Sequence, residues 1–266
     1  MKEDAFFLGQ LADKIDQCEN KYITTYTNFM DGHQQSIARI HCRKNFIPTT
    51  DEDRYEPGDM GSIPATRSIF YGGYPDAERV ILINLPDYAF LENENPLTVI
   101  RATKAERSRN LTHRDYLGSL IGLGIKREVL GDILVRDDGA DIICMDDFAD
   151  FVLMNYCKAG RANLSLEQVD IKDLIIPERK TQIITDTVAS PRLDSVVASA
   201  FGLSRGKASE AISARRVFVN HMETTKPDQQ LTEGDKITLR GRGKAVLSEI
   251  GGKSRKDRQY IKIERY

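Results

Sequence analysis

Ser204, Arg205 and Lys207 are residues that could hold an anion together. Ser204 is placed to cap a helix beginning at residue 205, which puts both cations into the first helical turn. Cations are unfavourable there by a few tenths of a kcal/mol, up to about 1 kcal/mol, because that end of the helix dipole is positive. A phosphate reverses the sign, since it accepts hydrogen bonds from the first-turn N–H groups and neutralises both side chains. The pattern therefore favours phosphate binding.

Further cations follow in the same C-terminal region. Arg215 and Arg216 come at the end of this helix, where cations are favoured in any case. The stretch Gly241-Arg-Gly-Lys244 lets the backbone and two cations approach a partner closely. The loop over 251–258 is also basic, although a solvated hairpin tip explains it equally well. The candidate RNA-phosphate residues are Arg192, Ser204, Arg205, Lys207, Arg215, Arg216, Lys226, Arg240, Arg242 and Lys244.

Local patterns predict a compact scaffold for these residues. Asp194 is placed to cap a helix over 192–201, which ends at Gly202. A second helix is expected over 204–214, and short strands then continue to the end of the chain. The first of them, over 217–220, forms a hairpin that Lys226 closes.

The charge distribution agrees with a nucleic-acid partner for this region. Residues 181–266 contain 16 Lys and Arg against 10 Asp and Glu, a formal charge of +6, whereas residues 1–180 contain 22 against 30, a formal charge of −8. A basic module is thus joined to an acidic body. Basic C-termini are often merely solvated, so charge alone leaves both interpretations open.

Composition limits the class of protein. The 266 residues are 40% hydrophobic and 29% charged, which is typical of a soluble globular protein of two or three domains. Uncharged apolar runs are too short for a membrane span or a signal peptide, so we expect a cytoplasmic protein with no membrane contact. The four cysteines include no C-x-x-C pair, which predicts free thiols and no metal site.

The region before the basic module divides into two expected parts. Residues 1–64 are predicted to be helical, with a break at Asp31-Gly32 and a loop from Pro48 to Pro64. Residues 65–176 are predicted to form an α+β domain of the ferredoxin or RNA-recognition-motif type. Its expected elements are strands at 68–71, 79–84, 97–103, 132–136 and 140–145, a helix from Thr112 to Gly122, and a helix over 146–158 with Phe148, Phe151, Val152 and Tyr156 on one side.

Other possible sites in these parts are weaker. Phe70, Tyr71 and Tyr74 could stack on bases, but aromatic residues on strands more often belong to a core. Lys126 and Arg127 could touch RNA, although a solvated turn is the favoured interpretation. His113-Arg114-Asp115 lacks the Asn that a kinase loop needs, and no hydrolase, zinc-protease or P-loop motif is present. We therefore expect no catalytic residue, cofactor or metal.

The C-terminal region contains, in this order, Arg192-Leu-Asp194, Ser204-Arg205, Val217 to Asn220, Lys226, and Gly234-Asp235 leading into Leu239-Arg-Gly241. In these elements it resembles the S4 domain, a small RNA-binding fold. The resemblance covers about residues 182–245, within an expected domain over 182–266 that includes a final hairpin. It departs from the family at His221, where Gly is usual after Asn220, and this predicts a wider hairpin.

The upstream region resembles the YlmH family, in Phe70 to Tyr74, Ala77 to Arg79, Leu111 to Gly118 and Gly122 to Ile133. The resemblance implies a helical N-terminal segment, an RNA-recognition-motif-like middle domain and a C-terminal S4 domain. It also implies RNA binding without known catalysis and links to the cell-division gene neighbourhood. The implied partners are ribosomal RNA and tRNA, on a large ribosomal subunit carrying peptidyl-tRNA, in rescue or quality control of stalled translation.

Three hypotheses remain at this stage. The first is a non-enzymatic protein that binds structured RNA. The second is an RNA-modifying enzyme that uses the S4 domain for delivery, and it requires a pocket with paired titratable groups in the middle domain. The third, compatible with the first, is that the acidic N-terminal body docks a protein partner.

Overall fold

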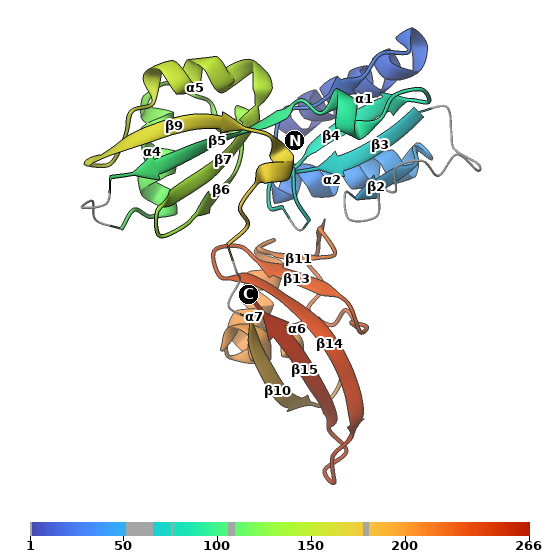
Figure 1. Cartoon of the computed structure of the whole chain (residues 1–266). Helices are drawn as coiled ribbons and strands as arrows, with labels where there is room; N and C mark the ends of the chain where they lie inside the picture. Colours follow the sequence, from blue (N-terminus) through green and yellow to red (C-terminus); the bar gives the residue numbers. More distant parts are fainter. Residues whose placement is uncertain (1, 52–65, 76, 106–109, 178–180) are drawn as a thin grey trace. The chain divides into compact units, whose positions relative to one another are not determined.

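The computed structural model describes residues 2–51, 66–75, 77–105, 110–177 and 181–266. The chain divides into two compact units, residues 1–177 and 178–266, which we describe separately. Figure 1 shows the elements of each. No helix within these ranges is long and apolar enough to cross a membrane.

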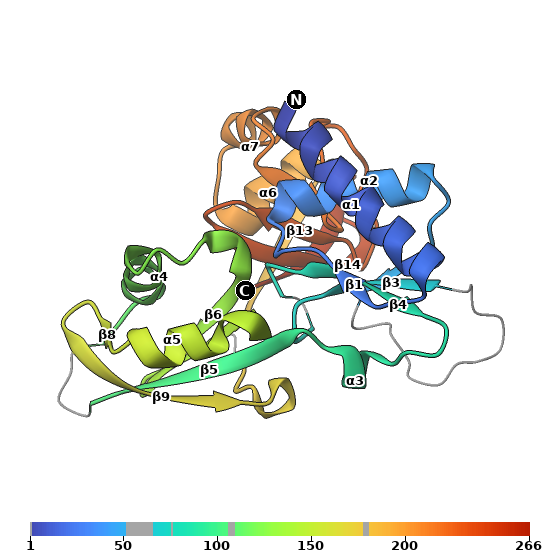
Figure 2. The same ribbon diagram turned by 90° about the horizontal axis from the view of Figure 1, so that it is seen from above.

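The N-terminal half of unit 1 is a four-stranded sheet with two helices, in the order β1-β4-β3-β2. Its helices α1 and α2 lie together over one face of this sheet (Figure 2), and α1 packs against β4. Strands β2 and β3 are parallel, and the other pairs are antiparallel. The elements are α1 (Lys2–Lys21), β1 (Thr25–Tyr26), α2 (Gly32–Lys44), β2 (Thr49–Asp51), β3 (Thr66–Tyr71) and β4 (Ile81–Pro86).

This sheet differs from the expected domain boundary at residue 65. The helices of residues 1–64 are present, but β3 and β4 pair with β1 and β2 rather than with the middle domain. Every residue of β4 is buried, so this strand needs a neighbour on each edge and a cover on each face. The predicted loop from Pro48 to Pro64 lies mostly outside the described residues, and its first part includes β2.

The second half of unit 1 is a five-stranded antiparallel sheet with the order β6-β7-β5-β9-β8. The succession β5-α4-β6-β7-α5-β9 is the ferredoxin-like arrangement that the sequence predicts. Its elements are α3 (Leu91–Glu94), β5 (Leu97–Lys104), α4 (His113–Gly122), η2 (Arg127–Val129), β6 (Leu130–Val135), β7 (Gly139–Met145), η3 (Asp146–Phe148), α5 (Ala149–Asn155), β8 (Lys158–Ala159), β9 (Ala162–Val169) and η4 (Ile171–Asp173).

The helix expected over 146–158 is shorter than predicted. α5 ends at Asn155 and packs on β5 and β9, as Figure 2 shows. Val152 and Tyr156 are buried as expected, but Phe148 and Phe151 are exposed, so the predicted apolar face is only half correct. A short 3-10 turn, η3, occupies the first residues of the expected helix, so Phe148 precedes α5 and does not share its helical spacing. One continuous apolar core runs through both sheets of unit 1.

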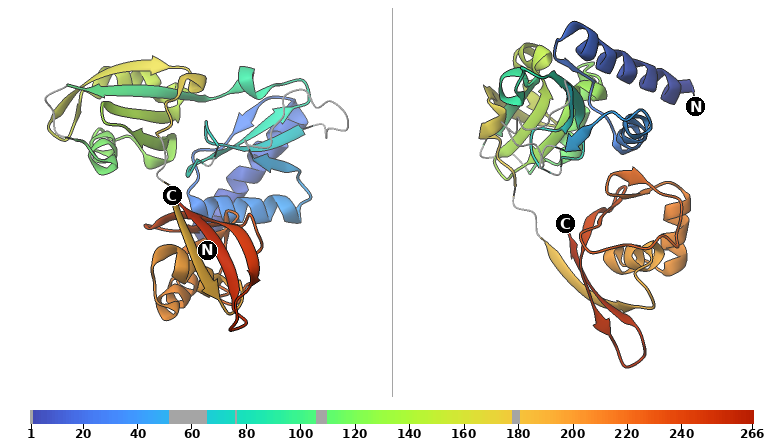
Figure 3. Two further views of the ribbon diagram at one scale, coloured as in Figure 1. Left: turned by 60° about the horizontal axis from the view of Figure 1, so that its bottom comes forward. Right: turned by 90° about the vertical axis from the view of Figure 1, so that its right-hand side faces the viewer.

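Unit 2 has a six-stranded sheet, β10-β15-β14-β13-β11-β12, and its own apolar core. Its two helices lie side by side against the strands (Figure 3), and Val196, Val197 and Ala200 of the first are buried as predicted. Its elements are β10 (Gln182–Val188), α6 (Leu193–Phe201), α7 (Arg205–Ser213), β11 (Val217–Val219), β12 (Met222–Glu223), β13 (Lys236–Leu239), β14 (Gly243–Lys253) and β15 (Gln259–Arg265).

Candidate nucleic-acid interface

Two arginines of unit 2 share one buried carboxylate. The side chain of Asp194, at the start of α6, is only 5% exposed. Arg192 donates to it from Nε and Nη2 at 3.2 and 3.1 Å, and Arg205 does the same at 3.2 and 3.1 Å. Burial alone would raise the pKa of Asp194, but the hydrogen bonds from both arginines outweigh burial and hold that pKa below its ordinary value. Asp194 is thus ionised and fixes two guanidinium groups.

This arrangement corrects the expected role of Asp194 as a helix cap. Arg192 occupies the cap position of α6, and the Asp194 side chain turns to the arginines instead. The first N–H groups of the helix are bound by a neighbouring loop, since Leu193 N–H donates to the Gln229 carbonyl at 2.8 Å and Asp194 N–H donates to the Pro227 carbonyl at 2.9 Å. The carboxylate is therefore left to pair with cations.

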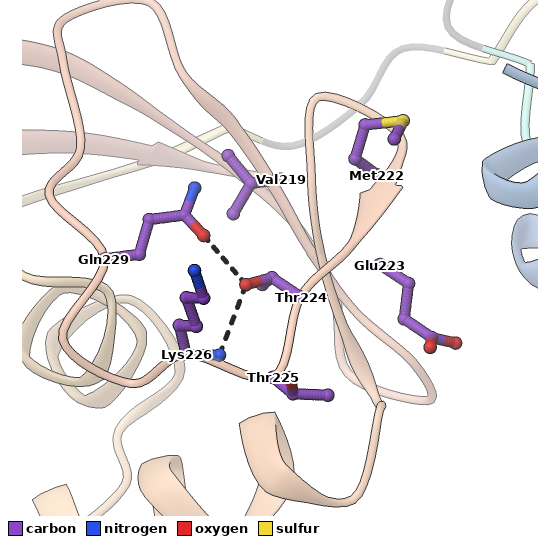
Figure 4. A pocket seen from close by; sticks show the side chains of 7 residues that line it. All are labelled: Val219, Met222, Glu223, Thr224, Thr225, Lys226 and Gln229. Atoms are coloured by element: carbon purple, nitrogen blue, oxygen red, sulfur yellow. Dashed lines mark hydrogen bonds between the residues drawn. The ribbon is translucent and has the colours of Figure 1, made fainter. Parts of the chain in front are cut away.

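The same loop brings Lys226 to this end of α6. Lys226 is exposed and lines a pocket of about 280 Å³ beside Thr224 and Gln229 (Figure 4). Thr224 Oγ1 donates to Gln229 Oε1 at 2.8 Å, and Lys226 N–H donates to Thr224 Oγ1 at 3.4 Å. The backbone bonds to α6 hold this loop close to Arg192.

The start of α7 confirms Ser204 as the predicted helix cap and shows which groups stay available to an anion. Ser204 caps the helix, because its Oγ accepts a hydrogen bond from Lys207 N–H at 3.3 Å. That N–H is therefore used by the cap and not open to a phosphate. Arg205 points back to Asp194 yet keeps 57% of its side chain exposed, and Lys207 is exposed as well. A guanidinium has five N–H donors, so Arg205 can bind Asp194 and a phosphate together.

The other predicted cations lie at the far end of α7 or near the corner between the two helices. Arg215 is 3.7 Å from the Glu223 carboxylate. Arg216 and Arg240 are linked through their backbones, with Arg240 N–H donating to the Arg216 carbonyl at 2.9 Å. α7 has nine residues, so about 14 Å separates its two ends.

The corner between α6 and α7 holds Arg242, whose Nη1 donates to the Phe201 carbonyl at 3.5 Å. Lys244 is half-buried in β14. Among the predicted residues, Arg192 and Arg205 thus meet at Asp194, whereas Arg215, Arg216 and Arg240 lie beyond the other end of α7. In the final loop, Lys253 pairs with Asp257 at 2.8 Å, while Arg255 and Lys256 are exposed.

The hairpin at His221 is tight, and the expectation of a wider one is wrong. Val219 pairs with Met222, so only Asn220 and His221 form the turn, with φ of 49° and 64°. Left-handed backbone at both positions is what a two-residue hairpin of this kind needs. The Asn220 side chain anchors the turn by donating to the Asp235 carboxylate at 2.7 Å and accepting from Lys236 N–H at 2.9 Å.

The aromatic residues considered for base stacking belong to the core. Phe70, Tyr71 and Tyr74 are all buried. The Arg39 guanidinium covers the Phe70 ring at 3.8 Å, and Tyr74 Oη donates to the Asp132 carboxylate at 2.7 Å. These rings pack in the core of unit 1 and are not accessible for stacking with a base.

Comparison with known proteins gives one matching family model in each of the two units. The family model described as "Putative RNA-binding domain in YlmH" matches residues 92–173, and the S4 domain model matches residues 191–237. The chain is 38% identical over 265 residues to "Ribosome-associated protein quality control protein P2" of Bacillus subtilis, covering 99% of this chain and 96% of the relative. The chain belongs to the YlmH family. A solved structure, "Cell division protein ylmH from Streptococcus pneumoniae", is 26% identical with a TM-score of 0.47, covering 65% of this chain and 95% of that one.

The matches place both family domains on elements already described. The first spans the ferredoxin-like sheet of this YlmH-family chain, and the second spans α6, α7, β11 and β12 and ends within β13. A pocket of about 870 Å³ in unit 1 lies along α1, and of its lining only Glu128 comes from the ferredoxin-like part. It is therefore not the pocket that the enzyme hypothesis requires in the middle domain.

Proposed function

We propose that this YlmH-family protein is a non-enzymatic RNA-binding protein that recognises structured ribosomal RNA or tRNA through its S4 domain. The pair of arginines on Asp194 carries this proposal. Their guanidinium groups are held in place on one side and open to solvent on the other, and Lys207 and Lys226 add two exposed charges nearby. Such groups bind phosphates and position a protein on RNA without reading its sequence, so recognition depends on RNA shape.

The proposed setting is the large ribosomal subunit carrying peptidyl-tRNA, in rescue or quality control of stalled translation. The name of the Bacillus subtilis relative, which is similar over nearly its whole length, supports a ribosome-associated role. That setting corresponds to a cytoplasmic protein. The acidic unit 1 remains a candidate for contact with a protein partner.

The dependence of RNA affinity on salt tests the proposal. Arg205→Ala with Lys207→Ala removes two cations while Arg192 still neutralises Asp194, so the fold is expected to persist. The slope of log affinity against log salt should flatten by about 1–2 units. Arg255→Ala with Lys256→Ala is the matched control, because it removes the same charge from an exposed loop of the same unit.

Sedimentation of the full chain with ribosomal subunits, with and without peptidyl-tRNA, tests the setting. We expect the chain to sediment with large subunits and more strongly when peptidyl-tRNA is present. Equal salt slopes for the two double variants would remove Arg205 and Lys207 from the interface, and absence of any salt-dependent RNA binding would refute the function.

A further inference from the structure

A groove runs along α1 in unit 1. It is the pocket of about 870 Å³ described above, and we call it the α1 groove. Its lining positions on α1 recur every three or four residues from Glu3 to Gln17, so one face of the helix borders it over about 21 Å. The rest of the lining comes from the segment over 26–30, from Gln34 and from Glu128. The groove is thus long enough for a partner segment of several helical turns.

The base of the α1 groove is apolar, and one aromatic ring beside it is exposed. Leu11, Phe29 and Met30 are buried in the core of unit 1, and Phe7 packs against that core. Phe6 also lines the groove but remains 69% exposed. An isolated exposed apolar residue needs no explanation, but a ring that borders an apolar groove is typical of a binding surface.

The charged side chains of the α1 groove are mostly acidic. Carboxylates of Glu3, Asp13 and Glu128 line it, and Lys14 is the one cation among the described residues of the lining. Glu128 has Lys126 at 3.7 Å, but both side chains are well exposed, so this weak pair leaves the carboxylate available to another cation. The groove therefore favours a cationic ligand and repels phosphate.

Two further carboxylates act on Tyr26, which belongs to the lining. Burial raises the pKa of Tyr26 above its ordinary value, and the charges of Asp147 and Asp146 raise it further. Both aspartates are exposed in η3. The acidic surface therefore continues from the α1 groove towards η3.

Nucleic acid and small molecules fit these observations less well than a protein segment does. Phosphates would meet like charge along the whole groove. A small molecule is usually enclosed in a compact cavity, whereas this lining extends over four turns of α1 with several exposed side chains. An amphipathic helix binds in a groove through apolar side chains at positions i, i+3, i+4 and i+7, and the lining of α1 has the same period.

We propose that the α1 groove binds a basic amphipathic helix of a protein partner. The apolar face of that helix packs on Phe6 and Phe7, and its Lys or Arg side chains pair with the carboxylates of Glu3, Asp13 and Glu128. This site goes beyond RNA binding by the S4 domain and does not depend on it. It gives the acidic unit 1 a partner of defined chemistry.

The test measures binding of a labelled peptide to the full chain by fluorescence anisotropy. The probe is a peptide of about 14 residues with Leu at positions i, i+3, i+4 and i+7 and Lys at the others. It should bind at least about tenfold more tightly than the same peptide with Glu in place of Lys. Equal binding of the two peptides would overturn the proposal.

Matched variants locate the binding in the groove. Phe6→Ser should weaken peptide binding about tenfold, whereas Phe46→Ser, at a ring that is 93% exposed outside the groove, should change it less than about twofold. Asp13→Asn should weaken binding about threefold, and Asp16→Asn, on α1 but outside the lining, should have a smaller effect. Lys14→Gln should strengthen binding about threefold, a direction that loss of folding cannot produce.

Three results would overturn the proposal. The first is an equal effect within each matched pair. The second is a loss of affinity for large-subunit ribosomal RNA, instead of the peptide, in Phe6→Ser, because the groove would then bind RNA. The third is a dimer of the chain that Phe6→Ser dissociates in sedimentation, because a second copy would then occupy the groove. Peptide binding should persist in Arg205→Ala with Lys207→Ala, so failure of this site and failure of the RNA-binding function are distinguished.

Discussion

Asp194→Asn separates two roles that this carboxylate could have beside the arginines that we propose to bind RNA. If Asp194 only neutralises charge, its removal should strengthen RNA binding. A charge about 6 Å from a phosphate is worth about 0.7 kcal/mol in a water-like dielectric. If Asp194 orients Arg192 and Arg205, its removal frees two long side chains. Fixing each of them again on RNA costs about 0.5–1.5 kcal/mol, or about 1–3 kcal/mol for both.

The second effect is the larger, so Asp194→Asn should weaken RNA binding by about 1 kcal/mol, or about fivefold in Kd. The assay is fluorescence anisotropy of a labelled ribosomal RNA fragment at one fixed salt concentration. Asp186→Asn is a suitable control, because it removes a carboxylate from an exposed strand position in the same unit. Binding by Asp194→Asn as tight as that of the unaltered chain would refute the orienting role.

The same substitution has a consequence for stability that depends on pH. Asn at this buried position loses charge-assisted bonds to two arginines, which can rehydrate because they are partly exposed, so we expect a loss of about 1.5–3 kcal/mol at pH 7. The pKa of Asp194 is lower in the folded chain than its ordinary value of 3.8. Its contribution is therefore complete above about pH 4 and is lost as the pH falls further. Urea unfolding should show that the variant lacks this acid-dependent part.

Two further substitutions test local geometry. His221→Gly should stabilise unit 2 by about 0.5–1 kcal/mol. Glycine removes the strain of the left-handed backbone, about 1–2 kcal/mol, which exceeds its entropy cost of about 0.4–1 kcal/mol. A lower midpoint of urea unfolding than that of the unaltered chain would contradict this. Asp141→Asn should destabilise unit 1 by about 3–5 kcal/mol, since the fully buried carboxylate binds both Arg101 and Arg136. Asp138→Asn, an exposed partner of Arg136, is the control and should cost less than about 1 kcal/mol in thermal unfolding.

The S4 helices could be predicted because their signals are local. Ser204 stands one residue before α7, and Gly202 ends α6 with φ of 60°. By contrast, the pattern of β3 and β4 identifies strands but not their partners, and the pairing with β1 spans more than fifty residues. The predicted start of the middle domain at residue 65 is therefore too early, because β3 and β4 belong to the N-terminal sheet.

The candidate site also combines features that local sequence predicts with features that depend on distant residues. The residue types and order around Ser204 indicated cations for phosphate, but a carboxylate near a helix start suits a cap or an ion pair equally well. Only the position of the loop over 227–229, which binds the N–H groups of α6, decides between them.

The Asp194 carboxylate limits the charge that Arg192 and Arg205 would present to RNA. The S4 pair includes a carboxylate, so about one net positive charge faces a phosphate, and the guanidinium groups are already oriented before binding. Counterion release scales with the charge that phosphates neutralise. Arg192 and Arg205 should therefore each contribute less to the salt dependence of RNA binding than the exposed Lys207, which has no carboxylate partner among the described residues.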